Sequence, residues 1–138
     1  DSWAMTDSIV PTLGVKPEER AAAWAAALDC LHNDGEYIRR FGIVLLLNYF
    51  LIPEYLDDVE EAIVSIRDQR YYVQMACAWL LAEMAVRDWH RVEGVLNSGR
   101  LNLFVHNMTI RKIRESLRIH QDVKAAAAAM KRKDDRNV

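Results

Sequence analysis

Apolar residues recur every three to four positions along most of the chain, as they do on the buried side of an α-helix. The segment before residue 67 shows this spacing clearly, at Leu56, Val59, Ile63 and Ile66. Strict alternation of apolar and polar residues, the pattern of a half-buried strand, is hard to find anywhere. The pattern therefore predicts an all-α protein.

Turn residues divide this pattern into separate helices. Pro17 suits a first helical position, and Gly99 suits the cap that follows a helix. The predicted helices are Pro17–His32, Glu36–Leu51, Pro53–Ile66, Tyr71–Val86, Trp89–Asn97, Leu103–Ile119 and Asp122–Met130. We expect residues 1–10 to end a further helix and the charged residues 131–138 to fray.

One pattern is written twice, in Asp34–Phe50 and again in Asp68–Met84. Each copy has an acidic turn, a tyrosine, a small residue in mid-helix and then an apolar run. At an offset of 34 residues, the matched pairs are Asp34 with Asp68, Tyr37 with Tyr71, and Gly42 with Ala76. Helical repeats of this period are typical of α-solenoids, in which each helical pair packs on the next.

We accordingly expect one domain, residues 1–138, built from helical pairs. The pairs are 17–32 with 36–51, 54–66 with 70–86, and 89–97 with 103–119. The helix expected at residues 1–10 would be half of a pair without its partner, which is unfavourable at the end of a solenoid. This indicates the C-terminal part of a longer array whose N-terminal repeats are missing, with an open end through which copies could self-associate.

The composition is that of an ordinary globular protein, with 51% hydrophobic and 28% charged residues. No run approaches the ~20 apolar residues that span a bilayer, and no basic leader precedes an apolar segment. Cys30 and Cys77 fall within apolar helical patterns, which indicates core packing in a reducing compartment. We therefore expect a cytoplasmic protein without a membrane partner.

Charge is segregated, although the net charge is only −2. Residues 54–68 are mainly acidic, whereas residues 100–119 carry five cations and one carboxylate. Those residues are Arg100, Arg111, Lys112, Arg114, Arg118 and Glu115. A basic face of this kind suits phosphate, but charged runs on helices are also ordinary solvent-facing surfaces.

Four side chains are candidates for chemistry in a groove. Trp3 and Asp7 share a helical face, one turn apart. Arg40 begins the second helix of its pair, and Trp79 lies in the equivalent helix one repeat later. Second helices commonly line one concave surface of a solenoid, so we expect Arg40 and Trp79 to face the same groove. Such a set suits a cationic or sugar-phosphate ligand.

Each of these residues also has a simpler interpretation. Trp79 fits a core position among small and aliphatic neighbours, Asp7 fits a surface charge, and Arg40 fits an ion pair with Glu36 one turn earlier. The four histidines lack metal-ligand spacing, and no glycine-rich phosphate loop appears. We expect no metal or other cofactor.

Several ordered blocks carry a family resemblance that covers nearly the whole chain. The blocks are Ser2–Pro11, Tyr37–Ile43, Tyr72–Glu83, Ser98–Leu101 and His106–Ser116. They resemble the DNA alkylation repair family, which includes alkylpurine DNA glycosylases built from HEAT-like repeats. The resemblance implies a right-handed array of such repeats. It also implies a bacterial, nucleoid-associated hydrolase that excises N3- and N7-alkylated purines from duplex DNA.

The resemblance assigns roles to particular residues. Asp7 matches the catalytic Asp, which stabilises the oxocarbenium-like sugar and orients water, and Trp3 and Trp79 match the aromatic residues of the lesion-facing cleft. Arg40 matches an Arg near the DNA backbone; Arg39 ranks below it, because the family varies there.

In the last, basic repeat, Arg111 and Lys112 are further candidates for the DNA backbone. Two alternatives remain open. One is a protein that binds damaged or branched DNA without cutting it, and the other is a protein-interaction scaffold.

Overall fold

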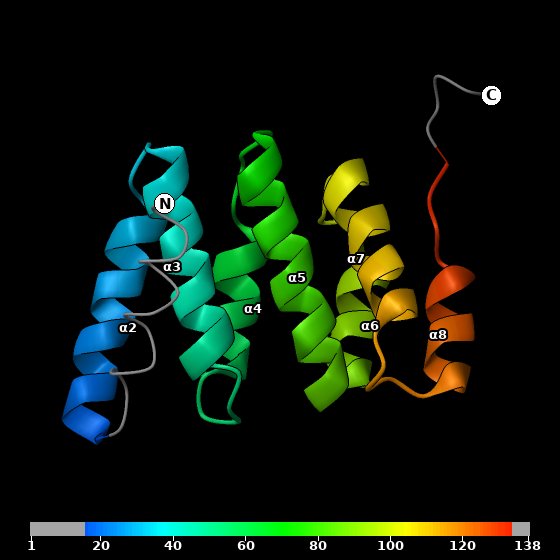
Figure 1. The fold of residues 1–138 in the computed structure, drawn as a ribbon, viewed down its shortest axis with the longest axis horizontal. Helices are drawn as coiled ribbons and strands as arrows, with labels where there is room; N and C mark the ends of the chain where they lie inside the picture. Colours follow the sequence, from blue (N-terminus) through cyan, green and yellow to red (C-terminus); the bar gives the residue numbers. More distant parts are fainter. Residues whose placement is uncertain (1–15, 134–138) are drawn as a thin grey trace. The chain divides into compact units, whose positions relative to one another are not determined.

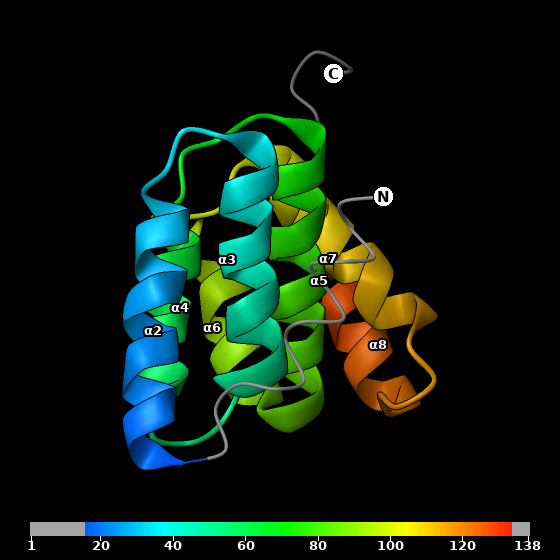
Figure 2. The ribbon, with the colours of Figure 1, turned by 60° about the vertical axis from the view of Figure 1, so that its left-hand side comes forward.

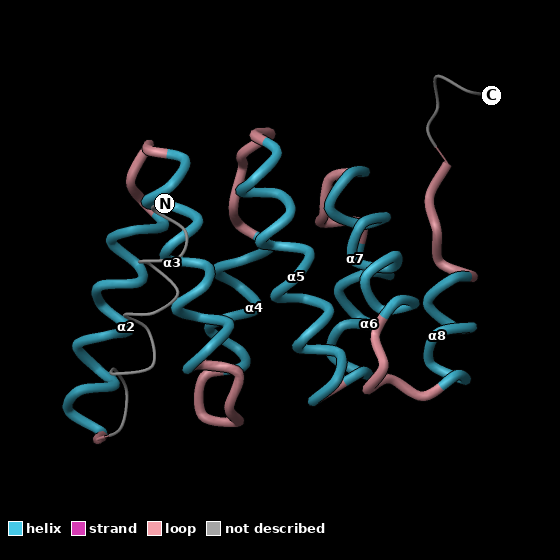
Figure 3. Tube along the Cα trace, viewed as in Figure 1, coloured by secondary structure: helices cyan, strands magenta, loops and turns pink. Residues whose placement is uncertain are grey.

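A computed structural model describes residues 16–133, which form seven α-helices and no strand (Figures 1 and 3). The helices are α2 (Pro17–Leu31), α3 (Glu36–Tyr49), α4 (Leu56–Val64), α5 (Tyr71–Arg87), α6 (Trp89–Ser98), α7 (Leu103–Glu115) and α8 (Gln121–Ala128). The all-α prediction is therefore confirmed for this part of the chain.

The chain divides into two compact units, residues 1–76 and residues 77–138, and the boundary lies within α5. In the described residues, the first unit contains α2, α3, α4 and the start of α5. The second unit contains the remainder of α5 with α6, α7 and α8.

Helices α2 and α3 form an antiparallel pair in the first unit (Figures 1 and 2). Helix α2 begins at Pro17, as predicted, and its first turn is acidic. Its buried residues are Ala23, Ala27 and Leu31. The alanine-rich sequence offers several equivalent faces, so the α3 partner decided which one is buried.

Gly42 is the point of closest approach between α2 and α3. A Cβ atom at this position would lie 2.9 Å from the carbonyl oxygen of Ala27 and 2.9 Å from the Cβ of Cys30. These distances are too short for a side chain, because the backbone carbonyl cannot move aside without shifting the helix. Gly42, the small residue of the first repeat copy, therefore allows α2 and α3 to pack closely.

Trp24 extends from the same pair into an aromatic cluster. Its ring centroid lies 5.2 Å from that of Phe50 and 5.0 Å from that of Tyr55, and the Phe50 and Tyr55 rings are 4.8 Å apart. Such tilted and edge-to-face contacts are favourable. They tie α2 to the segment that connects α3 with α4.

The predicted helix ends that differ most from the structure have local reasons. Pro53 does not begin a helix: the amide of Tyr55 donates to the carbonyl of Ile52 at 2.9 Å in a turn, and α4 starts at Leu56. Helix α7 ends at Glu115 rather than at residue 119. There the Ser116 hydroxyl accepts a bond from the amide of Arg118 at 3.1 Å, which competes with helical pairing.

Helices of the second unit are capped by side chains. Asp88 caps α6 through the amide of Arg91 at 3.2 Å, and Asn102 caps α7 through the amide of Val105 at 2.8 Å. Gly99 ends α6 with φ 73°, in the left-handed region that favours glycine, as predicted.

The segment after α8 is held against α7. The ring Nε2 of His106 lies 2.7 Å from the carbonyl oxygen of Met130, and Asn107 exchanges two hydrogen bonds with the backbone of Arg132. Arg132 also donates to the carbonyl of Leu101 at 2.7 Å. The tail that we expected to fray from residue 131 is thus anchored as far as Arg132.

Candidate functional site

Trp79 is an exposed indole within a buried stretch of α5. Trp79 is 37% exposed to solvent, whereas its sequence neighbours Ala78 and Leu80 are fully buried. The adjacent residues already fill the core, so the core interpretation of Trp79 does not hold. An aromatic ring kept at the surface of an apolar helix is available to a ligand.

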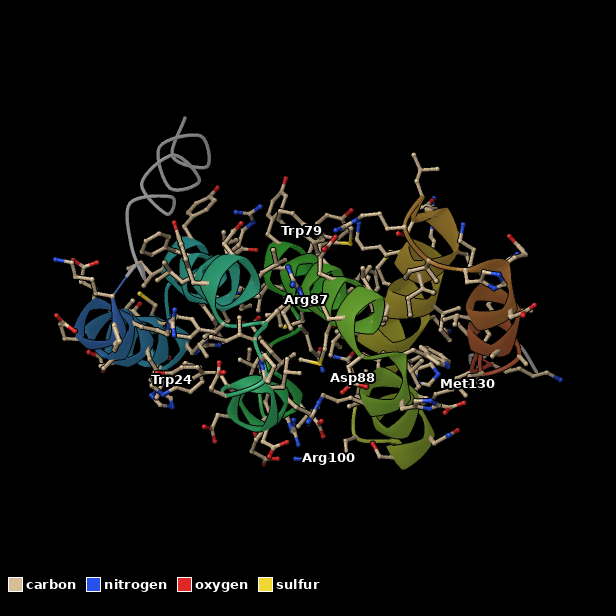
Figure 4. All side chains as sticks on the ribbon, turned by 90° about the horizontal axis from the view of Figure 1, so that it is seen from below. Trp24, Trp79, Arg87, Asp88, Arg100 and Met130 are labelled. Carbon is tan, nitrogen blue, oxygen red and sulfur yellow. The ribbon has the colours of Figure 1, made fainter. Side chains whose placement is uncertain are left out.

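A cavity of about 290 Å³ opens beside this indole, and we call it the Trp79 pocket. Its lining residues are Trp79, Ala82 and Glu83 from α5, with Lys112, Glu115, Ser116, Leu117 and Arg118 from the end of α7 and the loop that follows. Leu117 is completely exposed. Figure 4 shows Trp79 and Arg100 at opposite edges of the second unit.

An ion pair between Arg118 and Glu83 joins the two sides of the pocket. The pair joins the loop that follows the end of α7 to Glu83 on α5. It places the apolar side chain of Leu117 and the cation of Arg118 on the rim beside Trp79. The pocket thus combines an aromatic face, an aliphatic group and cations.

Arg111 and Lys112, the two candidates in the last repeat, line different cavities. Lys112 lines the Trp79 pocket. Arg111 lines a cavity of about 420 Å³ between α7 and α8, which we call the α7–α8 groove. Its other lining residues are Arg114, Glu115, Gln121, Lys124, Ala125 and Ala128. Glu115 lines both cavities.

The guanidinium of Arg39 is bonded to other groups of the protein. It donates from Nη1 to Oδ2 of Asp68 at 2.8 Å and from Nε to the carbonyl of Leu31 at 3.0 Å, and its Nη2 lies 3.7 Å from Asp34. Arg70 also bonds to Asp68, through its amide and its guanidinium. Hydrogen bonds from Arg70 and then Arg39 hold the pKa of Asp68 well below its usual range.

The remaining candidates are not brought together by the described residues. Trp3 and Asp7 lie outside the part of the chain that the structure describes. Arg40 lies half-buried on α3 in the first unit, and Trp79 belongs to the second unit. A groove shared by Arg40 and Trp79 therefore stays a prediction.

Several lining residues, among them Arg114, Arg118, Lys124 and Glu83, were missed as site candidates. Arg114 and Arg118 stand in the basic segment of the sequence, so their charge was a usable signal. Lys124 and Glu83 carried no such signal, because their proximity to α7 depends on how the helices pack.

Residues 16–133 contain neither a metal-binding cluster nor a membrane-spanning helix. No group of three or more His, Cys, Asp or Glu side chains there is arranged to hold a metal ion. No helix in that range has both the length and the apolar character needed to cross a membrane.

Comparison with known proteins gives one match. The family model described as DNA alkylation repair enzyme matches residues 1–129. No curated protein and no solved structure matches the chain. The match spans nearly the whole sequence, including α5, α7 and the Trp79 pocket, and agrees with the resemblance carried by the sequence blocks. The chain therefore belongs to the DNA alkylation repair family.

Proposed function

We propose that this protein is a DNA glycosylase that hydrolyses the N-glycosidic bond of cationic N3- or N7-alkylated purines in duplex DNA. The proposal includes an arrangement of its helices as HEAT-like repeats, whose DNA-facing side carries Trp79. Membership of a family of DNA alkylation repair enzymes makes DNA the expected partner.

The exposed indole of Trp79 is the observation that carries the proposal. A scaffold or a packing helix needs no tryptophan at the surface of an otherwise buried stretch. An alkylated purine carries positive charge, and so does the sugar as the bond breaks. The face of an indole attracts such a cation by about 0.5–2 kcal/mol, more when water is excluded.

The reaction needs little acid catalysis, because an alkylated purine is already a good leaving group. The glycosidic bond breaks with its electron pair moving to the base, which leaves neutral, and a water molecule adds to C1′ of the deoxyribose. Asp7 is proposed to stabilise the positive sugar and to accept or orient the proton of that water. The roles of Asp7 and Trp3 rest on the family resemblance.

The cations of the site have separate tasks in this proposal. Lys112, in the Trp79 pocket, and Arg40 contact phosphates and set the position of the duplex. Arg39 is assigned instead to holding the loop at Asp68, because its guanidinium is already bonded there.

A base-release assay tests the proposed function. The full-length protein is incubated with methylated duplex DNA, and free 7-methylguanine and 3-methyladenine are measured. We expect release by the wild type and nearly none by Asp7→Asn, which keeps the size of the side chain but removes its charge. Release by Asp7→Asn at the wild-type rate would contradict the mechanism.

A protein that binds DNA without cutting it is the second candidate, favoured by the cations that line the α7–α8 groove. It predicts binding that weakens steeply with salt and is reduced in Arg40→Ala, with no base release by the wild type. The same assay therefore separates the two functions.

A further inference from the structure

We propose that the α7–α8 groove binds phosphodiester groups of the DNA strand that continues from the Trp79 pocket. The inference rests on the proposed function only for the identity of its ligand as DNA. Arg114, Gln121 and Lys124 thereby become binding residues beside Arg111.

Charge in the groove favours an anion. Arg111, Arg114 and Lys124 supply three cations against the single carboxylate of Glu115, in a chain whose net charge is −2. Cations gathered at one site on an acidic protein concentrate the field there and attract phosphate. Each phosphate that a cation neutralises releases counterions from DNA, which makes binding sensitive to salt.

The shape of the groove also suits a polymer backbone. Ala125 and Ala128 form part of the α8 wall, and their small side chains leave space between α8 and the arginines of α7. An arginine grips phosphate oxygens in pairs, a lysine acts as a point charge, and the amide of Gln121 is a neutral donor. The cavity of about 420 Å³ is a groove rather than a closed site, so a strand can pass through it.

The groove and the Trp79 pocket meet at Glu115, which lines both of them. A strand whose damaged nucleotide lies against Trp79 would therefore place a neighbouring phosphate near the groove. Glu115 lies 3.4 Å from the Nε of Arg111, and both side chains are exposed. An exposed pair of this kind contributes little to stability, so Arg111 can turn to a phosphate at small cost.

A substitution at Glu115 should change DNA affinity in the opposite direction to substitutions of the groove cations. The carboxylate of Glu115 repels a phosphate in the groove and competes for Arg111. Neutralising Glu115 should therefore tighten DNA binding, whereas neutralising Lys124 or Arg114 should weaken it. A solvent-facing charge run that lies away from the bound DNA predicts neither change.

The experiment measures the affinity of the full-length protein for a short, undamaged, fluorescently labelled duplex between 50 and 200 mM salt. The variants are Lys124→Gln, Arg114→Gln and Glu115→Gln, with Arg100→Gln as the charge-matched control at the opposite edge of the second unit. Unfolding of each variant is followed by circular dichroism. All four side chains are wholly or partly exposed, so the fold should persist.

We expect Lys124→Gln and Arg114→Gln to bind more weakly than the wild type at 50 mM salt. The slope of log affinity against log salt should fall by about one for each lost contact. The wild-type advantage then shrinks about three- to fourfold between 50 and 200 mM salt. Glu115→Gln should bind more tightly, and Arg100→Gln should match the wild type.

The proposal would be overturned if Lys124→Gln and Arg114→Gln had the same affinities and salt slopes as Arg100→Gln. Weaker DNA binding by Glu115→Gln would also overturn it. The base-release assay remains a separate readout. A wild type that releases no base but shows the expected changes in binding overturns the proposed glycosylase activity and supports the groove. If the wild type releases base while the groove variants bind DNA as tightly as the wild type, the glycosylase activity is supported and the groove proposal is overturned.

Discussion

Arg39 donates a hydrogen bond of 2.8 Å to the carboxylate of Asp68, which joins the first turn of α3 to the loop before α5. Its other terminal nitrogen lies 3.7 Å from Asp34, the residue that matches Asp68 in the sequence repeat. One arginine thus contacts the acidic turn of both copies. The side chain of Asp68 is only 3% exposed and that of Arg39 is 16% exposed, so this link is part-buried within the first unit.

Asp68→Asn should destabilise the protein by about 2–3 kcal/mol, because the part-buried bond from Arg39 and the exposed bonds from Arg70 lose their charged acceptor. Urea unfolding, with an unchanged m-value, measures the loss. Asp34→Asn is the matched control, since its fully exposed carboxylate makes only a long contact with Arg39, and it should change stability by less than about 0.5 kcal/mol. Equal losses in the two variants would argue against a special role for Asp68.

Asp68 should also give the protein a pH dependence in acid. Its pKa in the folded state lies below the ordinary value of 3.8, so the unfolded chain takes up the proton more readily. The stability from this carboxylate is therefore complete above about pH 5 and is lost as pH falls through 3.8 and below. Acid unfolding of the wild type should be steeper than that of Asp68→Asn.

Gly42→Ala and Gly94→Ala should have opposite effects. The new methyl at position 42 would meet the Ala27 carbonyl at 2.9 Å, and overpacking of this kind costs about 1–3 kcal/mol. At position 94, in the middle of α6, no atom of the described part of the chain lies within 4 Å of an added Cβ, and alanine should stabilise the helix by about 0.5–1 kcal/mol. Thermal unfolding compares both variants with the wild type.

His106 should make stability decrease below neutral pH. Burial lowers the pKa of this histidine from its ordinary 6.5, and its Nδ1 has no hydrogen-bond partner among the described residues. The unfolded chain therefore binds the proton first, and the free energy of unfolding falls as pH drops below about 6.5. His106→Gln can still donate to Met130 but does not titrate, so its profile between pH 5 and 7 should be flatter.

Trp79→Ala should reduce base release roughly tenfold, which corresponds to the loss of one cation–π contact of about 1.4 kcal/mol in the transition state. Trp79→Phe keeps an aromatic face and should retain part of the activity. Trp79→Phe should unfold close to the wild-type temperature, whereas Trp79→Ala should unfold at a lower one, because Trp79 is only 37% exposed and the rest of its surface is buried. Full activity in Trp79→Ala would remove this residue from the proposed site.

The helices could be predicted closely, since most of their signals are local. Pro17 at the start of α2 and Gly99 after α6 act within one turn of the chain, and both are confirmed. The errors arose where a local side-chain hydrogen bond competes with the helical hydrogen bonds. At Ser116, for example, the hydroxyl accepts a bond from the amide of Arg118. Such competition is not visible in hydrophobic spacing.

The candidate site was only partly predictable. Trp79 was identified from the sequence, but the pattern alone fitted both a core and a surface position. Arg39 and Arg40 are adjacent in sequence and chemically identical, and the bond to Asp68, 29 residues away, separates their roles. Arg111 and Lys112 are likewise adjacent, yet the helical rotation of about 100° between neighbours directs them to different cavities.

By itself, the sequence determined the helical class, the repeat and the family blocks, because periodicity, turn residues and ordered motifs depend on nearby positions. The tertiary structure decided which side of α2 is buried, that Trp79 remains exposed, and that Glu83 meets Arg118. These outcomes depend on contacts between residues far apart in the chain. A helix with several similar faces chooses one only when it packs against its neighbour.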